Sequence, residues 1–150
     1  MRTRDDFNAR FQVQVPMPVQ WGDMDAFNHV NNAMYFRYFE TARLAYFETV
    51  GMPMDLQENT IGPILAETSC RFRRALTYPD KIISGAYVSE IHEYGFMMQY
   101  GVFSEAQNTV AALGTGRVVM LDYAEGSKVE PHAELIEHIQ KLDRIDIDRS

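Results

Sequence analysis

A long, largely apolar helix between strand-like segments constrains the fold of this chain more than any other sequence feature. Over residues 32–50, apolar side chains recur at the spacing of one helix face, as Tyr35, Phe39, Ala42 and Tyr46 show. The opposite side of this helix is also partly apolar, and a helix that is apolar all round is usually buried by other elements. The sequence therefore predicts a central helix that the rest of the chain wraps.

Both ends of this helix carry residues with a chemical reason to begin or end it. Asn31 is a good N-cap, because its side chain can accept a hydrogen bond from an unpaired N–H of the first turn. Gly51 suits the left-handed backbone that follows many helices, and Pro53 prevents the helix from continuing. We therefore expect the helix to begin just after Asn31 and to end just before Gly51.

The segments on either side of the helix alternate apolar and polar side chains with a period of two, which is typical of half-buried strands. They predict strands over residues 11–21, 64–73, 81–93, 96–104 and 110–123. Pro16 and Pro18 favour an edge position or an irregular path for the first strand over a central position, because proline cannot donate to a strand ladder. Gly114 and Gly116 share one face of the last strand, where another element could approach closely.

The order of the elements predicts the fold class. A short helix opens at Pro131, and the charged residues 143–150 are predicted to fray. Strands joined by short turns pair antiparallel, so we expect an α+β fold, with an antiparallel five-stranded sheet wrapped around the long central helix. With 46% apolar residues in 150, the chain is predicted to form one domain, residues 1–150, around one core.

Composition excludes several classes of function. A formal net charge of −7 argues against nucleic-acid binding, which needs a surplus of Lys and Arg on one face. Neither a membrane span nor an apolar signal segment is expected, so the predicted location is the cytoplasm. Cys70 is the only cysteine and is predicted to be buried and inert, and the four histidines lack metal-ligand spacing, so no metal site is predicted.

Chemistry-bearing residues concentrate in the polar loop just before the helix. Asp23, Asp25, Asn28 and His29 precede the two asparagines at the helix start. The free N–H groups and positive dipole end of a helix N-terminus can bind a carbonyl oxygen and its developing negative charge. A carboxylate a few residues upstream can attack the carbonyl carbon or activate water. This arrangement suits thioester hydrolysis.

Residues 21–43, which read WGDMDAFNHVNNAMYFRYFETAR, resemble the signature of the 4-hydroxybenzoyl-CoA thioesterase-like family of hotdog-fold acyl-CoA thioesterases. The resemblance extends more loosely through residues 66–75, the turn at 78–80 and the strand that ends in Asp122. It implies a hotdog fold, and hydrolysis of acyl-CoA to a carboxylic acid and CoA with no cofactor beyond the CoA of the substrate. It also implies a homodimer or homotetramer with sites at the subunit interfaces.

By this resemblance, individual residues receive roles. Asp25 takes the position of the catalytic aspartate, as nucleophile or general base, and the backbone N–H of Asn32 takes the position of the oxyanion donor. Asn28 and Asn31 are first of all helix-start residues and are also assigned to the substrate-binding set. Some relatives carry a basic run for the nucleotide phosphates where this chain has residues 92–95, which read HEYG. The first candidates for binding the CoA phosphates are instead the local basic cluster of Arg71, Arg73 and Arg74, and the secondary candidates are Arg117 and Lys128.

Several alternatives stay open at this point. Asp23 is the rival to Asp25, although a turn-forming role suits it better. His29 could act as a general base, or it could be a loop residue at the acyl entrance. The chain could also bind acyl thioesters without hydrolysis, act on acyl carrier protein, or be a hydratase or dehydratase in which His29 matters more.

Overall fold

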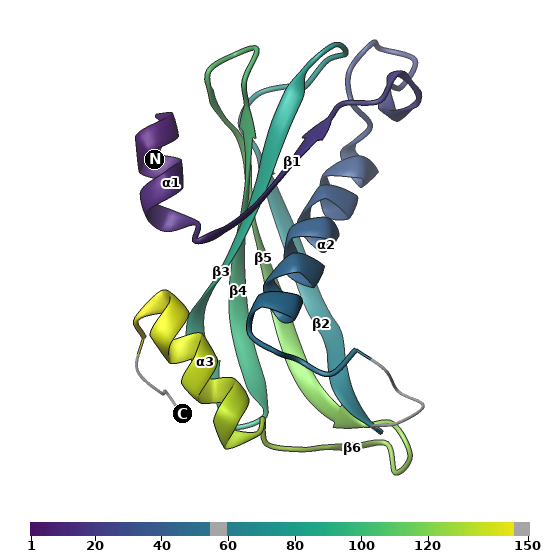
Figure 1. Cartoon of the computed structure of the whole chain (residues 1–150). Coiled ribbons are helices and arrows are strands. Elements are labelled where there is room, and N and C mark those ends of the chain that lie inside the picture. Colours follow the sequence, from purple (N-terminus) through teal and green to yellow (C-terminus); the bar gives the residue numbers. More distant parts are fainter. Residues whose placement is uncertain (55–59, 146–150) are drawn as a thin grey trace.

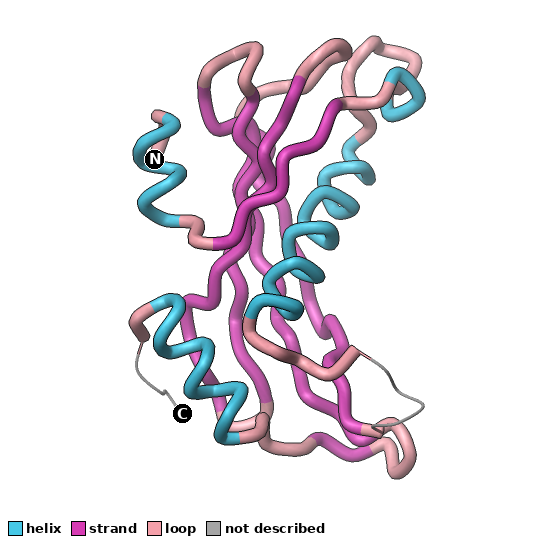
Figure 2. The backbone as a smooth tube through the Cα atoms, in the orientation of Figure 1, coloured by secondary structure: helices cyan, strands magenta, loops and turns pink. Residues whose placement is uncertain are grey.

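The computed structural model describes residues 1–54 and 60–145, which form one sheet with helices on both of its faces (Figure 1). The helices are α1 (Arg4–Arg10), α2 (Asn32–Thr49) and α3 (Ala133–Asp143), with a single 3-10 turn, η1 (Trp21–Asp23). The strands are β1 (Val13–Pro18), β2 (Ile61–Phe72), β3 (Lys81–His92), β4 (Gly95–Ser104), β5 (Thr109–Asp122) and the two-residue β6 (Ser127–Lys128). Figure 2 shows α2 lying beside the strands of the sheet, which extend beyond both ends of the helix.

The sheet has the strand order β1-β3-β4-β5-β2, and β6 pairs with β5. Every strand pair is antiparallel, so the predicted α+β hotdog architecture is confirmed. The proline-rich β1 lies at one edge, as the sequence predicted, and β2 lies at the other. The short β6 was not predicted, because two residues carry no detectable periodicity.

The ends of α2 confirm their sequence assignments. The Asn31 side chain accepts a hydrogen bond from the backbone N–H of Ala33 at 3.0 Å and so caps the helix. Gly51 follows the helix with a φ of +77°, in the left-handed region that favours glycine. The loop before α2 is thereby held at a defined point on the helix axis.

One face of α2 packs against the sheet and makes the main core. Phe39 of this face stacks on Tyr100 of β4, with 5.1 Å between ring centroids. A Cβ atom at Gly114 would overlap the Phe39 ring, so the predicted close approach at this glycine is confirmed. The sheet therefore wraps the helix as predicted. In the single chain the opposite face is partly uncovered, because Phe36 and Leu44 are exposed although Phe47 is buried.

The helix α1 was missed, and it covers the other face of the sheet. Its Phe7, together with Phe11 and Phe103, belongs to a second apolar cluster. With only seven residues, α1 has too few turns to show helical periodicity. The signal that could have found it is the capping box, in which Thr3 and Asp6 accept hydrogen bonds from each other's backbone N–H.

The helix α3 confirms the short helix predicted after Pro131, but it extends further than expected. Asp143 is its last residue, and its carboxylate accepts a 2.8 Å hydrogen bond from the N–H of Val88 and another from the hydroxyl of Tyr46. Asp143 therefore does not belong to a frayed tail, because its contacts tie the end of α3 to β3 and α2. The expectation for residues 146–150 lies outside the described residues.

Asp143 makes the stability of the chain depend on pH. Burial is the largest influence and raises its pKa above the ordinary value of 3.8, although the hydrogen bonds from Tyr46 and Val88 oppose this. The folded chain therefore holds this proton to higher pH than the unfolded chain does. The resulting contribution to stability is complete below pH 3.8 and is lost as the pH rises through the raised pKa.

Asp143→Asn removes this contribution, because an amide does not titrate. The free energy of unfolding of the wild type minus that of the variant is expected to fall as the pH rises from about 3.5 to 6. Urea unfolding of both proteins across this range measures the difference. A difference that stays constant or rises would contradict the assignment.

Candidate functional site

The polar loop between η1 and α2 folds into a small hairpin. Met24 and Val30 form an isolated antiparallel bridge, and the N–H of Asp25 donates to the carbonyl of His29 at 2.8 Å. At the tip, Asn28 has a φ of +60° and donates its N–H to the carbonyl of Asp25 at 3.1 Å. Asparagine tolerates this left-handed backbone better than most residues. The hairpin therefore gives Asp25 a fixed position just upstream of α2.

The carboxylate of Asp25 is held by one oxygen and presents the other. Its Oδ1 accepts hydrogen bonds from the backbone N–H groups of Phe27, at 2.8 Å, and His29, at 3.3 Å. Within residues 1–54 and 60–145, no hydrogen bond is found for Oδ2. The side chain is partly exposed. Its geometry therefore combines a fixed orientation with an oxygen that has no hydrogen-bond partner among the described residues.

The start of α2 supplies an unused backbone donor. The Asn31 side chain caps the N–H of Ala33, and the Asn31 N–H donates to the carbonyl of Asp23 at 2.9 Å. The N–H of Asn32, between these two, has no hydrogen-bond partner in the described part of the chain, and the residue is exposed. A free N–H at the positive end of a helix dipole can bind a carbonyl oxygen that is gaining negative charge.

Asp23, the rival carboxylate, is engaged in holding the loop. It is 8% exposed, and its Oδ2 accepts hydrogen bonds from the N–H of Gln20 and the hydroxyl of Tyr38, each at 2.9 Å. Burial and the bond to Asp23 raise the pKa of Tyr38 above its ordinary value, so its hydroxyl stays protonated and donates. Tyr38 is buried, as expected from its spacing, but its role as an anchor for Asp23 was not predicted.

The structure brings the end of β2 beside this loop. The N–H of Val30 donates to the carbonyl of Leu76 at 2.8 Å, and the N–H of Leu76 donates to the hydroxyl of Tyr35 at 3.2 Å. The predicted basic cluster lies just before Leu76 and is exposed; it consists of Arg71, Arg73 and Arg74. The guanidinium of Arg73 donates to the carbonyl of Met1 at 2.9 Å. The backbone that follows the cluster therefore lies beside the loop in space, although about forty residues separate the two in sequence.

The secondary basic candidates lie elsewhere. Arg117 and Lys128 line a cavity of about 410 Å³ on the outer face of the sheet, together with His92 at the end of β3 and Glu93 and Tyr94 of the β3–β4 turn. The cavity therefore joins cationic groups of β5 and β6 to the turn where some relatives carry basic residues. An aromatic side chain beside cations is a combination that can bind a phosphorylated nucleotide.

Cys70 is only partly buried, in contrast to the prediction, although it packs against the main core. Burial still raises the pKa of its thiol to about 11, which keeps it protonated near neutral pH. Among the described residues, no cluster of three His, Cys, Asp or Glu side chains is placed to hold a metal ion. None of the described helices has the length and apolar composition needed to cross a membrane.

Comparison with known proteins agrees with this architecture. Residues 19–139 match the model of the thioesterase-like superfamily. A curated protein of Aquifex aeolicus (strain VF5), whose name assigns it provisionally to the esterases, is 30% identical over 88 residues, covering 58% of this chain and 69% of that protein.

Solved structures are similar over most of the chain. A thioesterase of Thermus thermophilus, determined with coenzyme A and Zn, is 26% identical, with a TM-score of 0.79, and the match covers 92% of this chain and 98% of that one. The DHNA-CoA thioesterase of Staphylococcus aureus is 16% identical, with a TM-score of 0.78, over 87% of this chain and 90% of that one. At this lower identity, the second likeness concerns the fold alone.

Proposed function

This chain belongs to the thioesterase-like superfamily, whose activity is thioester hydrolysis, and we propose that its substrates are acyl-CoA thioesters that react at the loop before α2. The observation that carries the proposal is that this loop and helix start hold two groups without a hydrogen-bond partner in the described part of the chain, the Oδ2 of Asp25 and the backbone N–H of Asn32. The Thermus thermophilus thioesterase that was solved with coenzyme A supports CoA as the carrier. The products are a free carboxylic acid and the thiol of CoA.

The oxyanion role falls to the start of α2. As the thioester carbon becomes tetrahedral, its oxygen gains negative charge and accepts a hydrogen bond from the Asn32 N–H. The cap on Ala33 holds the first turn in place, so this donor does not have to reorganise during the reaction. In this scheme Asn31 acts by positioning the donor, because its side chain is already used in the cap.

Asp25 supplies the attack. Its Oδ2 either bonds to the thioester carbon, forming an anhydride that water then cleaves, or takes a proton from a water molecule that attacks the same carbon. In both routes the C–S bond breaks and the thiolate of CoA leaves. Asn28 and His29, exposed beside Asp25, are the side chains that we assign to the substrate entrance. Arg71, Arg73 and Arg74 are proposed to attract the CoA phosphates, because they are exposed near this loop.

We further propose that two copies of the chain pair through β2. This edge strand bonds to β5 alone in the described sheet, and its central residues are exposed. An exposed strand edge is a template for pairing with another strand. Phe36 and Leu44 on the uncovered face of α2 add apolar area beside that edge. A twofold axis through β2 would bury both surfaces and bring each helix face near the partner subunit.

Light scattering tests the assembly. We expect a mass of at least twice the 17.3 kDa of one chain, as a dimer or as a tetramer built from two dimers. Thr68→Lys places a cation on the middle of the exposed edge and should raise the dimer dissociation constant at least about tenfold. Thr77→Lys, at an exposed threonine after the strand, is the matched control and should leave the mass unchanged. A monomeric wild type would disprove the assembly.

Thiol release from a panel of short, long and aromatic acyl-CoAs tests the activity. Release from a saturated acyl-CoA supports hydrolysis, and water addition to an enoyl-CoA without thiol release would support a hydratase instead. Release only from acyl-carrier-protein thioesters would replace CoA as the carrier. Binding of acyl-CoA without turnover would identify a non-hydrolytic binding protein.

A further inference from the structure

A cavity of about 240 Å³ lies between the second half of α2 and the first half of β2. Leu44, Phe47 and Leu65 contribute to its apolar lining. Among the described residues that line it, Arg43 is the one with a charged side chain. The volume is below the range of about 300–1,000 Å³ that is typical of pockets for whole ligands. The cavity therefore suits one end of a ligand.

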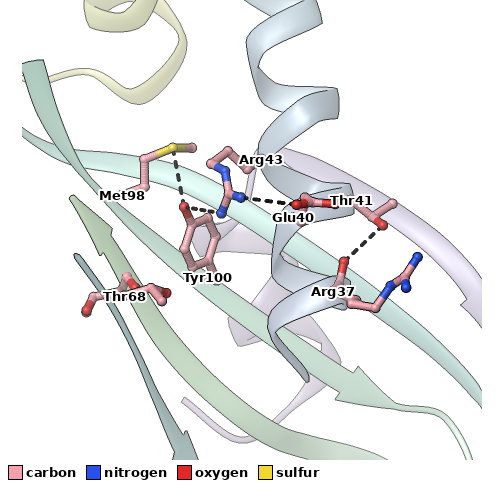
Figure 3. Close-up of polar contacts among 8 residues, drawn as sticks. Arg37, Glu40, Thr41, Arg43, Thr68, Met98 and Tyr100 are labelled. Carbon is pink, nitrogen blue, oxygen red and sulfur yellow. Dashed lines mark hydrogen bonds and ion pairs between the residues drawn. The ribbon is translucent and has the colours of Figure 1, made fainter. Parts of the chain in front are cut away.

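Arg43 is an unusual cation for this position, because its side chain is 11% exposed. Its Nη1 donates to the hydroxyl of Tyr100 at 3.2 Å, and its Nη2 lies 3.8 Å from the carboxylate of Glu40, whose side chain is 58% exposed (Figure 3). A guanidinium has five N–H donors. Within the described chain, these two contacts therefore leave most of its donors unused.

We propose that this cavity receives the far end of the acyl group, and that Arg43 selects acyl groups that carry a carboxylate at that end. This inference rests on the proposed acyl-CoA hydrolysis. The apolar wall would cover the methylene groups, and the planar guanidinium can bind a carboxylate through two parallel hydrogen bonds. The exposed Glu40 is a weak competitor, because an ion pair at the surface contributes about 0–1 kcal/mol.

The distance along α2 indicates which reaction centre the cavity serves. Arg43 lies eleven residues after Asn32, which is about 17 Å along a helix axis. A short acyl group held at Asn32 would not reach the cavity of the same chain. The partner subunit's loop is the better candidate, as the orientation of β2 shows.

The helix α2 and the strand β2 run in opposite directions. Phe72, at the end of β2, contacts Tyr35 in the first turn of α2, with 4.9 Å between ring centroids. The cavity lies at the other end of β2, beside Leu65. Antiparallel pairing of two β2 strands would place the end of each strand beside the beginning of the other. The catalytic loop of the partner subunit would then face the mouth of this cavity.

The test compares matched acyl-CoAs that differ only in a terminal carboxylate. The pairs are succinyl- and butyryl-CoA, adipoyl- and hexanoyl-CoA, and suberoyl- and octanoyl-CoA. For at least one pair, the wild type is expected to show a kcat/KM at least about tenfold higher for the carboxylated substrate. A ratio near one or below it in every pair would overturn the inference.

Variants of two arginines on α2 identify the residue responsible. Arg43→Met keeps an unbranched apolar side chain but removes the guanidinium, and it is expected to reduce the ratio to about one. Arg37→Met, at an exposed arginine on the same helix, is the matched control and should keep the wild-type ratio (Figure 3). An unchanged ratio in Arg43→Met would overturn the assignment. If a thermal melt shows that Arg43→Met does not fold, Arg43→Lys is used instead. Lysine cannot form the two parallel hydrogen bonds to a carboxylate, so the ratio should fall in this variant too.

The result also separates this inference from the proposed function. If the wild type hydrolyses both members of every pair equally well, the proposed activity stands and the proposed role of Arg43 is overturned. If it releases no thiol from any substrate, the proposed activity is overturned. Calorimetric measurement of acyl-CoA binding then tests this inference separately. Tighter binding of adipoyl-CoA than of hexanoyl-CoA, with the difference lost in Arg43→Met, would support it. Equal binding of the two acyl-CoAs would overturn it.

Discussion

Asp25→Asn is expected to lower the turnover number of thioester hydrolysis by about 10²–10⁴-fold, the range that one acid–base or nucleophilic group usually contributes. The substitution removes the charge and basicity of the free oxygen. It keeps an oxygen that can accept the hydrogen bonds from the N–H groups of Phe27 and His29. The loop should therefore keep its shape, and the KM for acyl-CoA should change much less than the turnover number.

A second aspartate offers a close control for this experiment. Asp122 also accepts a hydrogen bond from the N–H two residues later, that of Ala124, at 2.9 Å. Asp122→Asn makes the same chemical change in the same kind of turn, at the end of β5, and should leave turnover within a factor of about two. Asp25→Asn with wild-type turnover would remove Asp25 from the mechanism. Equal losses in both variants would indicate a nonspecific effect of the substitution.

Phe39→Ala is expected to lower the free energy of unfolding by about 3–5 kcal/mol, the usual cost of deleting a buried aromatic ring. Phe39 is 1% exposed, and its ring fills the space between Tyr100 and the backbone of Gly114. Because the glycine has no side chain that could move into the vacated volume, the cavity would persist. Urea unfolding at one fixed protein concentration measures the loss.

Phe27→Ala is the matched control for the core substitution. Phe27 is 82% exposed, so removal of its ring should change the free energy of unfolding by no more than about 0.5 kcal/mol. A loss below about 1 kcal/mol in Phe39→Ala would show that the sheet and helix close around the vacated space, and that the contact with Gly114 does not hold the helix in place.

The fold could be predicted from the sequence because its main determinants are local. Period-two and helical spacing identified the long strands and α2, since a side chain's face follows directly from its position in a regular element. Asn31 and Gly51 marked the ends of α2, because cap chemistry depends only on neighbouring backbone groups. The short α1 and β6 were not predicted, because their seven and two residues are too few to establish a period.

The candidate site was predicted only in outline. The order of Asp25 and Asn32 along the chain placed a carboxylate before a helix start, and the preference for Asp25 over Asp23 came from the family resemblance and from the turn-forming character of Asp23. The tertiary structure separates them, because Tyr38 lies fifteen residues away in sequence and still binds the buried carboxylate of Asp23. The partners of Asp25 come from its own hairpin, and both donate to Oδ1. Its Oδ2 therefore has no hydrogen-bond partner among the described residues.

The sequence by itself therefore determined the order of the elements, the ends of α2 and the presence of a carboxylate-bearing loop before a helix, all of which depend on residues close together in the chain. Only the tertiary structure decided which side chains are free to react. Arg43 is an example. It follows apolar residues on α2, and its position in the helical pattern does not indicate a cavity. That cavity exists because β2 and α2, distant in sequence, run side by side. Contacts of this kind depend on how the whole sheet packs, and local patterns do not encode them.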